Sequence, residues 1–367
     1  MSPIEGARPL AIVTGAGGQD GFYLIRGLVQ DGFVVHGTIR QGGSAFTAPR
    51  WAPDQTVVIH ELDLREPAGY AELIAALRPD ELYNLAGISS VATSFLDPEA
   101  AWRTNADAAE VMLEAVRKHS PTTRFYQSSS SEMFGSPQGQ ETSRDEDSPL
   151  RPQSPYAAAK AAAHLLCAAY RGAYDLRVAC GILFNHESSR RPATFLTRKV
   201  VDHVKALRRA PPAAAEQIPP LAMGNLATRR DWGFAPDYVA GIRLIMGQIE
   251  VRGRVLGEPP QEDRGFNYRD YVLGTGRLHA VWELVDRAFY LGGLPLDWDR
   301  TGDPSRWRAC FLGTSKSAVV VDATFMRSAD PPAIESDPSR ARTELGWDPR
   351  PGLDPFLREM LEHGDEP

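Results

Sequence analysis

Residues 10–21 read LAIVTGAGGQDG, in which an apolar run passes directly into a glycine-rich turn. The run 10–14 predicts a buried strand, and the apolar spacing of 23–31 predicts a helix after the turn. Gly15, Gly18 and Gly21 have GxxGxxG spacing, which lets the backbone turn tightly and approach a pyrophosphate at the positive end of the helix. Glycine-rich turns are common, but one that joins a strand to a helix at the start of a βα series predicts a dinucleotide site.

The first half of the chain continues this alternation of short apolar runs and longer helical patterns. The predicted strands are 10–14, 34–39, 57–62, 82–85, 124–128 and 178–183, and the predicted helices include 23–31, 101–118 and 155–170. Continuous apolar strands are typical of a parallel sheet that helices cover on both faces. The sequence therefore predicts the α/β class, with a doubly wound parallel sheet of the Rossmann type.

The pattern changes after about residue 186. Residues 194–207 are predicted to be helical, whereas the proline-rich segment 209–220 and the polar segment 252–270 are predicted loops. We expect residues 1–186, with a returning segment near 225–250, to form the dinucleotide-binding domain. Residues from about 187 to 367 should form most of a smaller C-terminal α/β substrate domain over the carboxyl ends of the strands, where ligands bind in open α/β sheets.

The composition argues against several other classes of protein. The chain has a formal net charge of −7 and is 43% hydrophobic and 24% charged, which is typical of a globular protein and gives no support to nucleic-acid or membrane binding. No apolar run approaches the roughly 20 residues needed to span a bilayer. The N-terminal residues also lack the pattern of a secretory signal. We expect a cytoplasmic protein.

The three cysteines are Cys167, Cys180 and Cys310. They are far apart in the sequence and have no CxxC spacing, which predicts buried free thiols and neither a disulfide framework nor a zinc site. His186 has no partner at a spacing typical of metal ligands. The sequence therefore predicts no metal.

The residue that follows the second strand selects the cofactor. A carboxylate there would accept hydrogen bonds from the adenosine ribose, but this chain has Arg40, nineteen positions after Gly21. A cation at this position suits a 2′-phosphate and favours NADP(H) over NAD(H), although a solvated surface arginine is the alternative. Asp63 follows the third strand and is placed either to contact adenine or to cap a helix. Residues 84–87 would let the main chain pass close to the cofactor.

A serine run at 128–131, followed by Glu132 and then by Tyr156 and Lys160, carries the predicted chemistry. Tyr156 and Lys160 are four residues apart on a predicted helix and share one face. The ammonium and the positive nicotinamide would lower the tyrosine pKa from about 10. Tyr156 could then remove a hydroxyl proton while hydride leaves the same carbon, with Ser130 bonded to the reacting oxygen.

Glu132 indicates an elimination step if the oxidised carbon is C4 of a sugar. The C5 proton is then acidic, and one carboxylate could remove it and protonate the departing C6 hydroxyl. Hydride return to C6 would complete a dehydration without net oxidation. The alternative is that Glu132 is a carboxylate favoured by a helix dipole.

These residues resemble a known family. The chain is similar over nearly its whole length to the extended short-chain dehydrogenase/reductases, and within them to the GDP-mannose 4,6-dehydratases. The blocks that carry the resemblance include TGAGGQDGFYL at 14–24, GILFNHESSRR at 181–191, TFLTRK at 194–199 and GNLATRRDWGFAPDYV at 224–239. The later blocks are far more specific than GxxGxxG or YxxxK.

The resemblance implies roles for individual residues. Ser130, in place of the family's threonine, would act with Glu132, Tyr156 and Lys160. Asn185, Arg191, Lys199 and Arg230 would hold the nucleotide diphosphate and base, and His186 and Glu187 would lie beside the nicotinamide. The implied cofactor-binding residues are Gly15, Gly18, Gln19, Asp20, Gly21, Arg40, Asp63, Leu64, Leu85, Ala86, Gly87, Tyr156, Lys160, Leu183, Asn185, His186 and Arg191. The implied substrate-binding residues are Ser89, Ser130, Glu132, Asn185, Lys199, Gly224, Arg230, Arg327 and Glu335.

The resemblance also implies a GDP-sugar substrate and a homodimer or homotetramer. The chain departs from the family at 87–91, where a glutamine and a histidine near the sugar are missing, and in the loop 40–46, which joins subunits in the family. The alternatives are a nucleotide-sugar epimerase or 4-keto reductase, a decarboxylase of a nucleotide-linked uronic acid, and a protein that binds the cofactor without catalysis.

Overall fold

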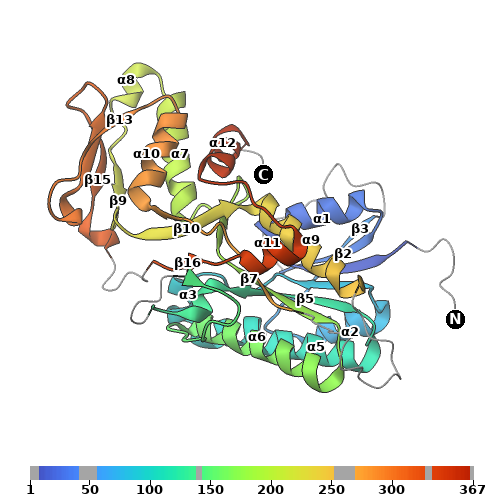
Figure 1. The fold of residues 1–367 in the computed structure, drawn as a ribbon. Coiled ribbons are helices and arrows are strands. Elements are labelled where there is room, and N and C mark those ends of the chain that lie inside the picture. The colour runs from blue at the N-terminus through green and yellow to red at the C-terminus, as the bar shows by residue number, and fades with distance from the viewer. Residues whose placement is uncertain (1–7, 41–55, 138–142, 252–268, 327–332, 364–367) are drawn as a thin grey trace.

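A seven-stranded parallel sheet forms the centre of the computed structural model, which describes residues 8–40, 56–137, 143–251, 269–326 and 333–363 (Figure 1). The strands lie in the order β11-β7-β5-β4-β1-β2-β3, and all six neighbouring pairs are parallel. Their bounds are β1 Leu10–Thr14, β2 Val34–Ile39, β3 Val57–Glu61, β4 Glu81–Asn84, β5 Arg124–Ser130, β7 Val178–Leu183 and β11 Tyr271–Leu273. The order reverses beside β1, so β1 and β4 flank the switch point at which such sheets bind ligands.

Helices cover both faces of this sheet, as Figure 1 shows. On one face, Val13 packs in a cluster with Leu24 of α1 (Gln19–Gln30) and Ile242 of α9 (Ala235–Val251). On the other, Ile12 packs with residues of α2 (Ala68–Leu77), α5 (Ala108–His119) and α6 (Pro155–Tyr174). Because adjacent strand residues point to opposite faces, the apolar run of β1 supplies both clusters. The predicted doubly wound α/β fold is confirmed.

The predicted helix 101–118 is interrupted. The chain forms α4 (Pro98–Trp102), a π-helical turn (Arg103–Asp107) and then α5. The Thr104 hydroxyl donates to the Ala100 carbonyl at 2.7 Å, and Asn105 Nδ2 donates to the Ala101 carbonyl at 2.9 Å. Side chains that bond to the backbone one turn earlier bend or break the helical ladder. Within the predicted loop 209–220, a short helix, α8 (Pro212–Ala215), is present.

A second apolar cluster lies among the C-terminal elements. It joins α7 (Leu196–Arg209), α10 (Val281–Leu291) and α12 (Asp354–His363) through residues such as Val204, Phe289 and Phe356. Two small sheets adjoin them, β8-β10-β12 and β13-β14-β15-β9. Their strands are β8 Asn185–Glu187, β9 Leu221–Met223, β10 Arg229–Phe234, β12 Leu278–Ala280, β13 Leu296–Asp299, β14 Arg308–Phe311 and β15 Ser317–Val321.

Two further elements connect the parts. Strand β16 (Glu335–Ser336) pairs in parallel with β6 (Ser143–Arg144), and α11 (Ser339–Leu345) contacts α9 and β11. Among the described residues, none of the helices is both long enough and apolar enough to cross a membrane. The domain boundary near residue 187 stays a prediction.

Candidate active site

The glycine turn after β1 leaves no room for a side chain at Gly21 and has a left-handed backbone at Gly15. Gly15 has φ +72°, and a Cβ on Gly21 would lie 2.3 Å from the Gly15 carbonyl oxygen. Gly18 begins α1 without a side-chain cap. The first backbone N–H groups of α1 therefore have no side-chain acceptor from the N-cap, which is the chemistry that suits a phosphate. This turn fits the pyrophosphate of a dinucleotide.

The next two residues, Gln19 and Asp20, turn toward β8. Gln19 Nε2 donates to the His186 carbonyl at 3.0 Å. His186 Nε2 lies 3.0 Å from Asp20 Oδ2, and its Nδ1 lies 2.7 Å from the Phe184 carbonyl oxygen. Since both neighbours of the ring are acceptors, both ring nitrogens donate and the imidazole is protonated. Burial opposes both charges, but the pKa of Asp20 is lowered by His186 and Arg191, and the pKa of His186 is raised by Asp20.

The Asp20–His186 pair predicts a pH-dependent stability. The contribution of His186 is complete below its unfolded pKa of about 6.5 and is lost as pH rises through its raised folded pKa. The contribution of Asp20 is present above about pH 3.9 and is lost as pH falls through its lowered folded pKa. Asp20→Asn should therefore lower the free energy of unfolding by about 1–3 kcal/mol between about pH 4 and 6.5, and by less at higher pH.

Urea unfolding of the protein without cofactor measures this difference. Asp31→Asn is the matched control, because Asp31 pairs with Arg243 on the surface and should change stability little at any pH. A loss for Asp20→Asn that is constant from acid to alkaline pH would contradict the assignment.

The remaining predicted cofactor residues lie at the carboxyl ends of the strands. Arg40 is exposed after β2, Asp63 pairs with Arg65 at 2.5 Å, and Leu64 is buried. Leu85 N and Ala86 N donate to the Thr14 hydroxyl at 3.0 Å each, which fixes the chain after β4 beside the glycine turn.

Asn105 is a residue that the sequence analysis missed. A Cβ on Gly87, which has φ +152°, would lie 2.3 Å from Asn105 Oδ1. That oxygen is buried and has no hydrogen-bond partner within the part of the chain that the structure describes. It lies on the π-helical turn, and such turns are frequent at functional sites. A π-helical turn has no sequence signature, so local patterns could not have identified it.

The four predicted catalytic residues come from β5, from the short helix after it and from α6. Ser154 caps α6 by accepting from Ala157 N at 3.1 Å, and Pro155 starts the helix. Tyr156 is buried, and both the Ser130 hydroxyl and the charge of Glu132 act on the pKa of its phenol. Lys160 Nζ donates to the Ser128 carbonyl at 2.9 Å. The structure thus brings the phenol, the hydroxyl and the carboxylate together, with the ammonium one turn away.

The expected lowering of the Tyr156 pKa is wrong for the protein alone. The pKa of Tyr156 is raised to about 12, mainly by burial and also by the charge of Glu132, while Ser130 and Arg191 act to lower it. Lys160 is directed at the Ser128 carbonyl, and burial lowers its own pKa to about 8. The sequence pattern placed the two side chains on one face but could not weigh desolvation against charge.

The cationic residues predicted to hold the diphosphate have different neighbours. Arg191 Nε is 3.1 Å from the buried carboxylate of Glu187, the guanidinium lies over Phe195, and its charge reaches the Tyr156 phenol. Lys199 Nζ donates to the Ala222 carbonyl at 2.7 Å and lies 3.8 Å from the centre of the Phe325 ring. Arg191 is thereby tied to the catalytic group.

The other predicted substrate residues, and the predicted cofactor residue Leu183, lie on several different elements. A Cβ on Gly224 would lie 2.4 Å from the Phe325 carbonyl oxygen. Three of them are placed by strand pairing: in the strand registers Asn185 lies opposite Trp232, Arg230 lies opposite His279, and Glu335 lies opposite Ser143. Leu183 pairs with Ser130, and Ser89 is exposed before α3 (Val91–Leu96). Arg327 lies outside the described residues.

Comparison with known proteins agrees with this geometry. The family described as "GDP-mannose 4,6 dehydratase" matches residues 12–360. The chain is 36% identical to GDP-mannose 4,6 dehydratase 2 of Arabidopsis thaliana, with 98% of this chain and 88% of the relative covered. It is 33% identical to GDP-mannose 4,6 dehydratase of Homo sapiens, with 98% and 91% covered.

Solved structures share the fold at lower identity. The UDP-glucose 4-epimerase of Thermotoga maritima with UDP-glucose has a TM-score of 0.73 at 18% identity, covering 96% of this chain and 97% of that one. The dTDP-glucose 4,6-dehydratase of Bacillus anthracis in complex with NAD has a TM-score of 0.70 at 19% identity, covering 96% and 95%. These similarities concern the fold alone.

Proposed function

The chain belongs to the GDP-mannose 4,6 dehydratase family, and on that premise we propose that it converts GDP-mannose, or a related GDP-sugar, to the 4-keto-6-deoxy product with NADP(H). The observation that carries the proposal is that Ser130 and Glu132, from the end of β5 and the short helix after it, both act on the buried phenol of Tyr156. A phenol and a carboxylate at one site supply the two proton transfers that oxidation and elimination need.

Each catalytic residue has a defined role in this reaction. Tyr156, as phenolate, takes the proton of the C4 hydroxyl, and Ser130 holds that oxygen by a hydrogen bond. Glu132 then removes the C5 proton and gives a proton to the C6 hydroxyl, which leaves as water. A cofactor held by the glycine turn would accept hydride from C4 and return it to C6, while Tyr156 gives the proton it took to C5 and is again a phenolate. The substrate loses water, and the cofactor is unchanged after each cycle.

The direct test incubates the purified protein with GDP-mannose and follows the product by mass spectrometry. The proposal expects a loss of one water without net consumption of added NADP. A product of unchanged mass would indicate an epimerase instead. If GDP-mannose is inert, GDP-, UDP-, CDP- and dTDP-sugars are compared by thermal shift, where a ligand at 100 times its Kd stabilises by about 2.7 kcal/mol.

Arg40 supports the choice of NADP(H). It is exposed at the end of β2, where its guanidinium can meet a 2′-phosphate. Arg40→Ala should raise the Kd for NADPH about 10–150-fold, which corresponds to the about 1.5–3 kcal/mol of a hydrogen bond to a charged group. The Kd for NADH should change little. Fluorescence titration measures both constants, and Arg26→Ala, an exposed arginine on α1, is the control.

The finer assignments are also proposals. Asn185, Arg191, Lys199 and Arg230 would hold the diphosphate and base, since an acidic protein needs local cations for an anionic ligand. Residues 1–186 with 225–250 would form the cofactor domain, and the rest of 187–367 the sugar domain. None of the three cysteines forms a disulfide, although Cys310 is partly exposed and not buried as predicted, and unpaired cysteines support a cytoplasmic location.

A homodimer or homotetramer is supported by exposed apolar side chains on neighbouring helices. Phe95, Leu96, Trp102 and Leu165 are 59%, 87%, 45% and 58% exposed, on α3, α4 and α6. These helices contact one another, and adjacent exposed apolar residues of this size mark interaction surfaces. Light scattering during gel filtration would show a monomer if the proposal is wrong.

A further inference from the structure

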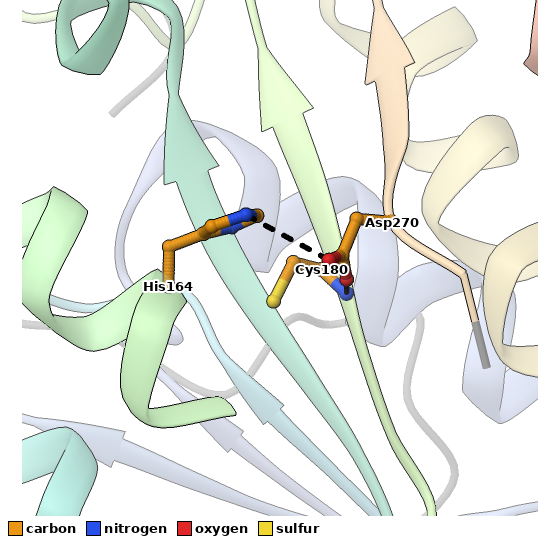
Figure 2. A group of neighbouring side chains, drawn as sticks. All are labelled: His164, Cys180 and Asp270. Carbon is orange, nitrogen blue, oxygen red and sulfur yellow. Dashed lines mark hydrogen bonds and ion pairs between the residues drawn. The ribbon is translucent and has the colours of Figure 1, made fainter. Parts of the chain in front are cut away.

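A buried group of metal-ligating side chains lies outside the proposed active site. His164 comes from α6, Cys180 from β7, and Asp270 immediately precedes β11 (Figure 2). One ligand atom from each lies within 4.8 Å of the other two. His164 is 8% and Cys180 0% exposed. Buried polar groups of this kind need partners, and nothing in the proposed reaction uses them.

A fourth potential ligand adjoins this group. Cys167 follows His164 by three residues on α6 and is fully buried, and it acts to raise the pKa of the Cys180 thiol. Its sulfur is not one of the three ligand atoms that lie within 4.8 Å of one another. Two cysteines, one histidine and one carboxylate are a donor set typical of zinc in proteins. The sequence analysis excluded zinc because the cysteines are far apart in the chain, but α6 packs against β7 and brings two of them together.

The outer contacts of these side chains would orient them as ligands. His164 Nδ1 is 3.0 Å from the Ser129 hydroxyl, which leaves Nε2 directed toward Asp270. Asp270 Oδ1 accepts from Arg171 Nη1 at 2.8 Å and from Cys180 N at 3.0 Å, and Oδ2 accepts from Arg171 Nη2 at 2.8 Å. Metal-bound histidines and carboxylates have such hydrogen-bonded partners on their far sides.

The distances and charges are also compatible with an ion. His164 Nε2 lies 3.7 Å from Asp270 Oδ2. Two such ligands of a tetrahedral zinc ion are about 3.4 Å apart, and about 4.2 Å is the largest separation that one ion can bridge. Two thiolates, one carboxylate, the Arg171 guanidinium and Zn²⁺ sum to zero charge, so a buried ion here would be neutralised.

We propose that His164, Cys180 and Asp270, joined by Cys167 as the fourth ligand when the ion binds, form a structural zinc site. The ion would join α6, which carries Tyr156 and Lys160, to β7 and to the start of β11. With Cys167 as the fourth ligand no position would stay open, so the site would be structural and not catalytic. The competing arrangement is an Arg171–Asp270–His164 ion-pair network without metal.

The test is the metal content of the full-length protein, purified without a chelator and with any affinity tag removed. Inductively coupled plasma mass spectrometry should find about one zinc ion per chain. Cys180→Ser and His164→Gln should each lower the content at least about tenfold, consistent with the loss of a ligand. Cys310→Ser is the control, because Cys310 is a partly exposed cysteine of the same chain and should retain the metal.

Protein produced in cobalt medium gives a second readout that does not depend on activity. Thiolate coordination to Co²⁺ should add intense charge-transfer absorption in the near ultraviolet, and this absorption should be absent from Cys180→Ser. If that variant does not fold, the zinc content and the cobalt absorption of the wild-type protein still test the proposal. Zinc below about a tenth of an equivalent, together with no cobalt absorption, would overturn the proposal and leave the ion-pair network.

Discussion

Replacing Glu132 by glutamine is expected to slow formation of the 4-keto-6-deoxy product by about 10²–10⁴-fold, the usual contribution of a positioned acid–base group. Glutamine keeps the size of the side chain and can still lie beside Tyr156, so the fold should not change. It can neither take the C5 proton nor protonate the departing C6 hydroxyl. The first step, oxidation at C4, does not use this carboxylate and should continue.

Because Glu132→Gln should stop the reaction after oxidation at C4, the accumulated intermediates distinguish this step from the others. Glu132→Gln should accumulate reduced nicotinamide and a 4-keto sugar that has kept its C6 hydroxyl. Rapid-mixing absorbance of the reduced cofactor and mass spectrometry of the quenched sugar measure the two. Glu66→Gln, at an exposed position, is the control. Full product formation by Glu132→Gln would show that another group performs the elimination.

Local sequence patterns predicted the strands and helices that carry the catalytic residues. Where a predicted boundary differs from the structure, the cause is local. The strand 124–128 continues to Ser130 because Ser129 and Ser130 still pair with Ile182 and Leu183 of β7. Serine is not a typical strand residue, so composition ended the predicted strand two residues early. This pairing has a functional consequence, because it fixes Ser130 where Tyr156 can bond to it.

Contacts between distant parts of the chain could not be predicted from spacing. Asp20 and His186 are 166 residues apart and form a partly buried ion pair, although each belongs to a block that the family resemblance identified. Cys167 and Cys180 meet only because α6 packs on β7. Side-chain pairing of this kind depends on which elements become neighbours, and a single sequence does not contain that information.

Tyr156→Phe is expected to stop the reaction one step earlier than Glu132→Gln. Without the phenol no group takes the C4 hydroxyl proton, so product formation should fall about 10²–10⁴-fold or more. No reduced nicotinamide should accumulate. Binding of cofactor and GDP-sugar should persist, because the ring remains and fills the same buried space. Accumulation of reduced cofactor by this variant would identify a different base.

The pKa of Tyr156 adds a pH dependence to this prediction. A pKa of about 12 leaves only about one phenolate in 10⁵ molecules of free protein at pH 7. A positive nicotinamide beside the phenol favours the phenolate, so the apparent pKa in the wild-type complex should lie below 12. The rate of C4 oxidation should therefore rise with pH up to that apparent pKa, and the residual rate of Tyr156→Phe should lack this rise. Single-turnover rates between about pH 6 and 10 measure both profiles, and a parallel rise in the two proteins would assign the titration to another group.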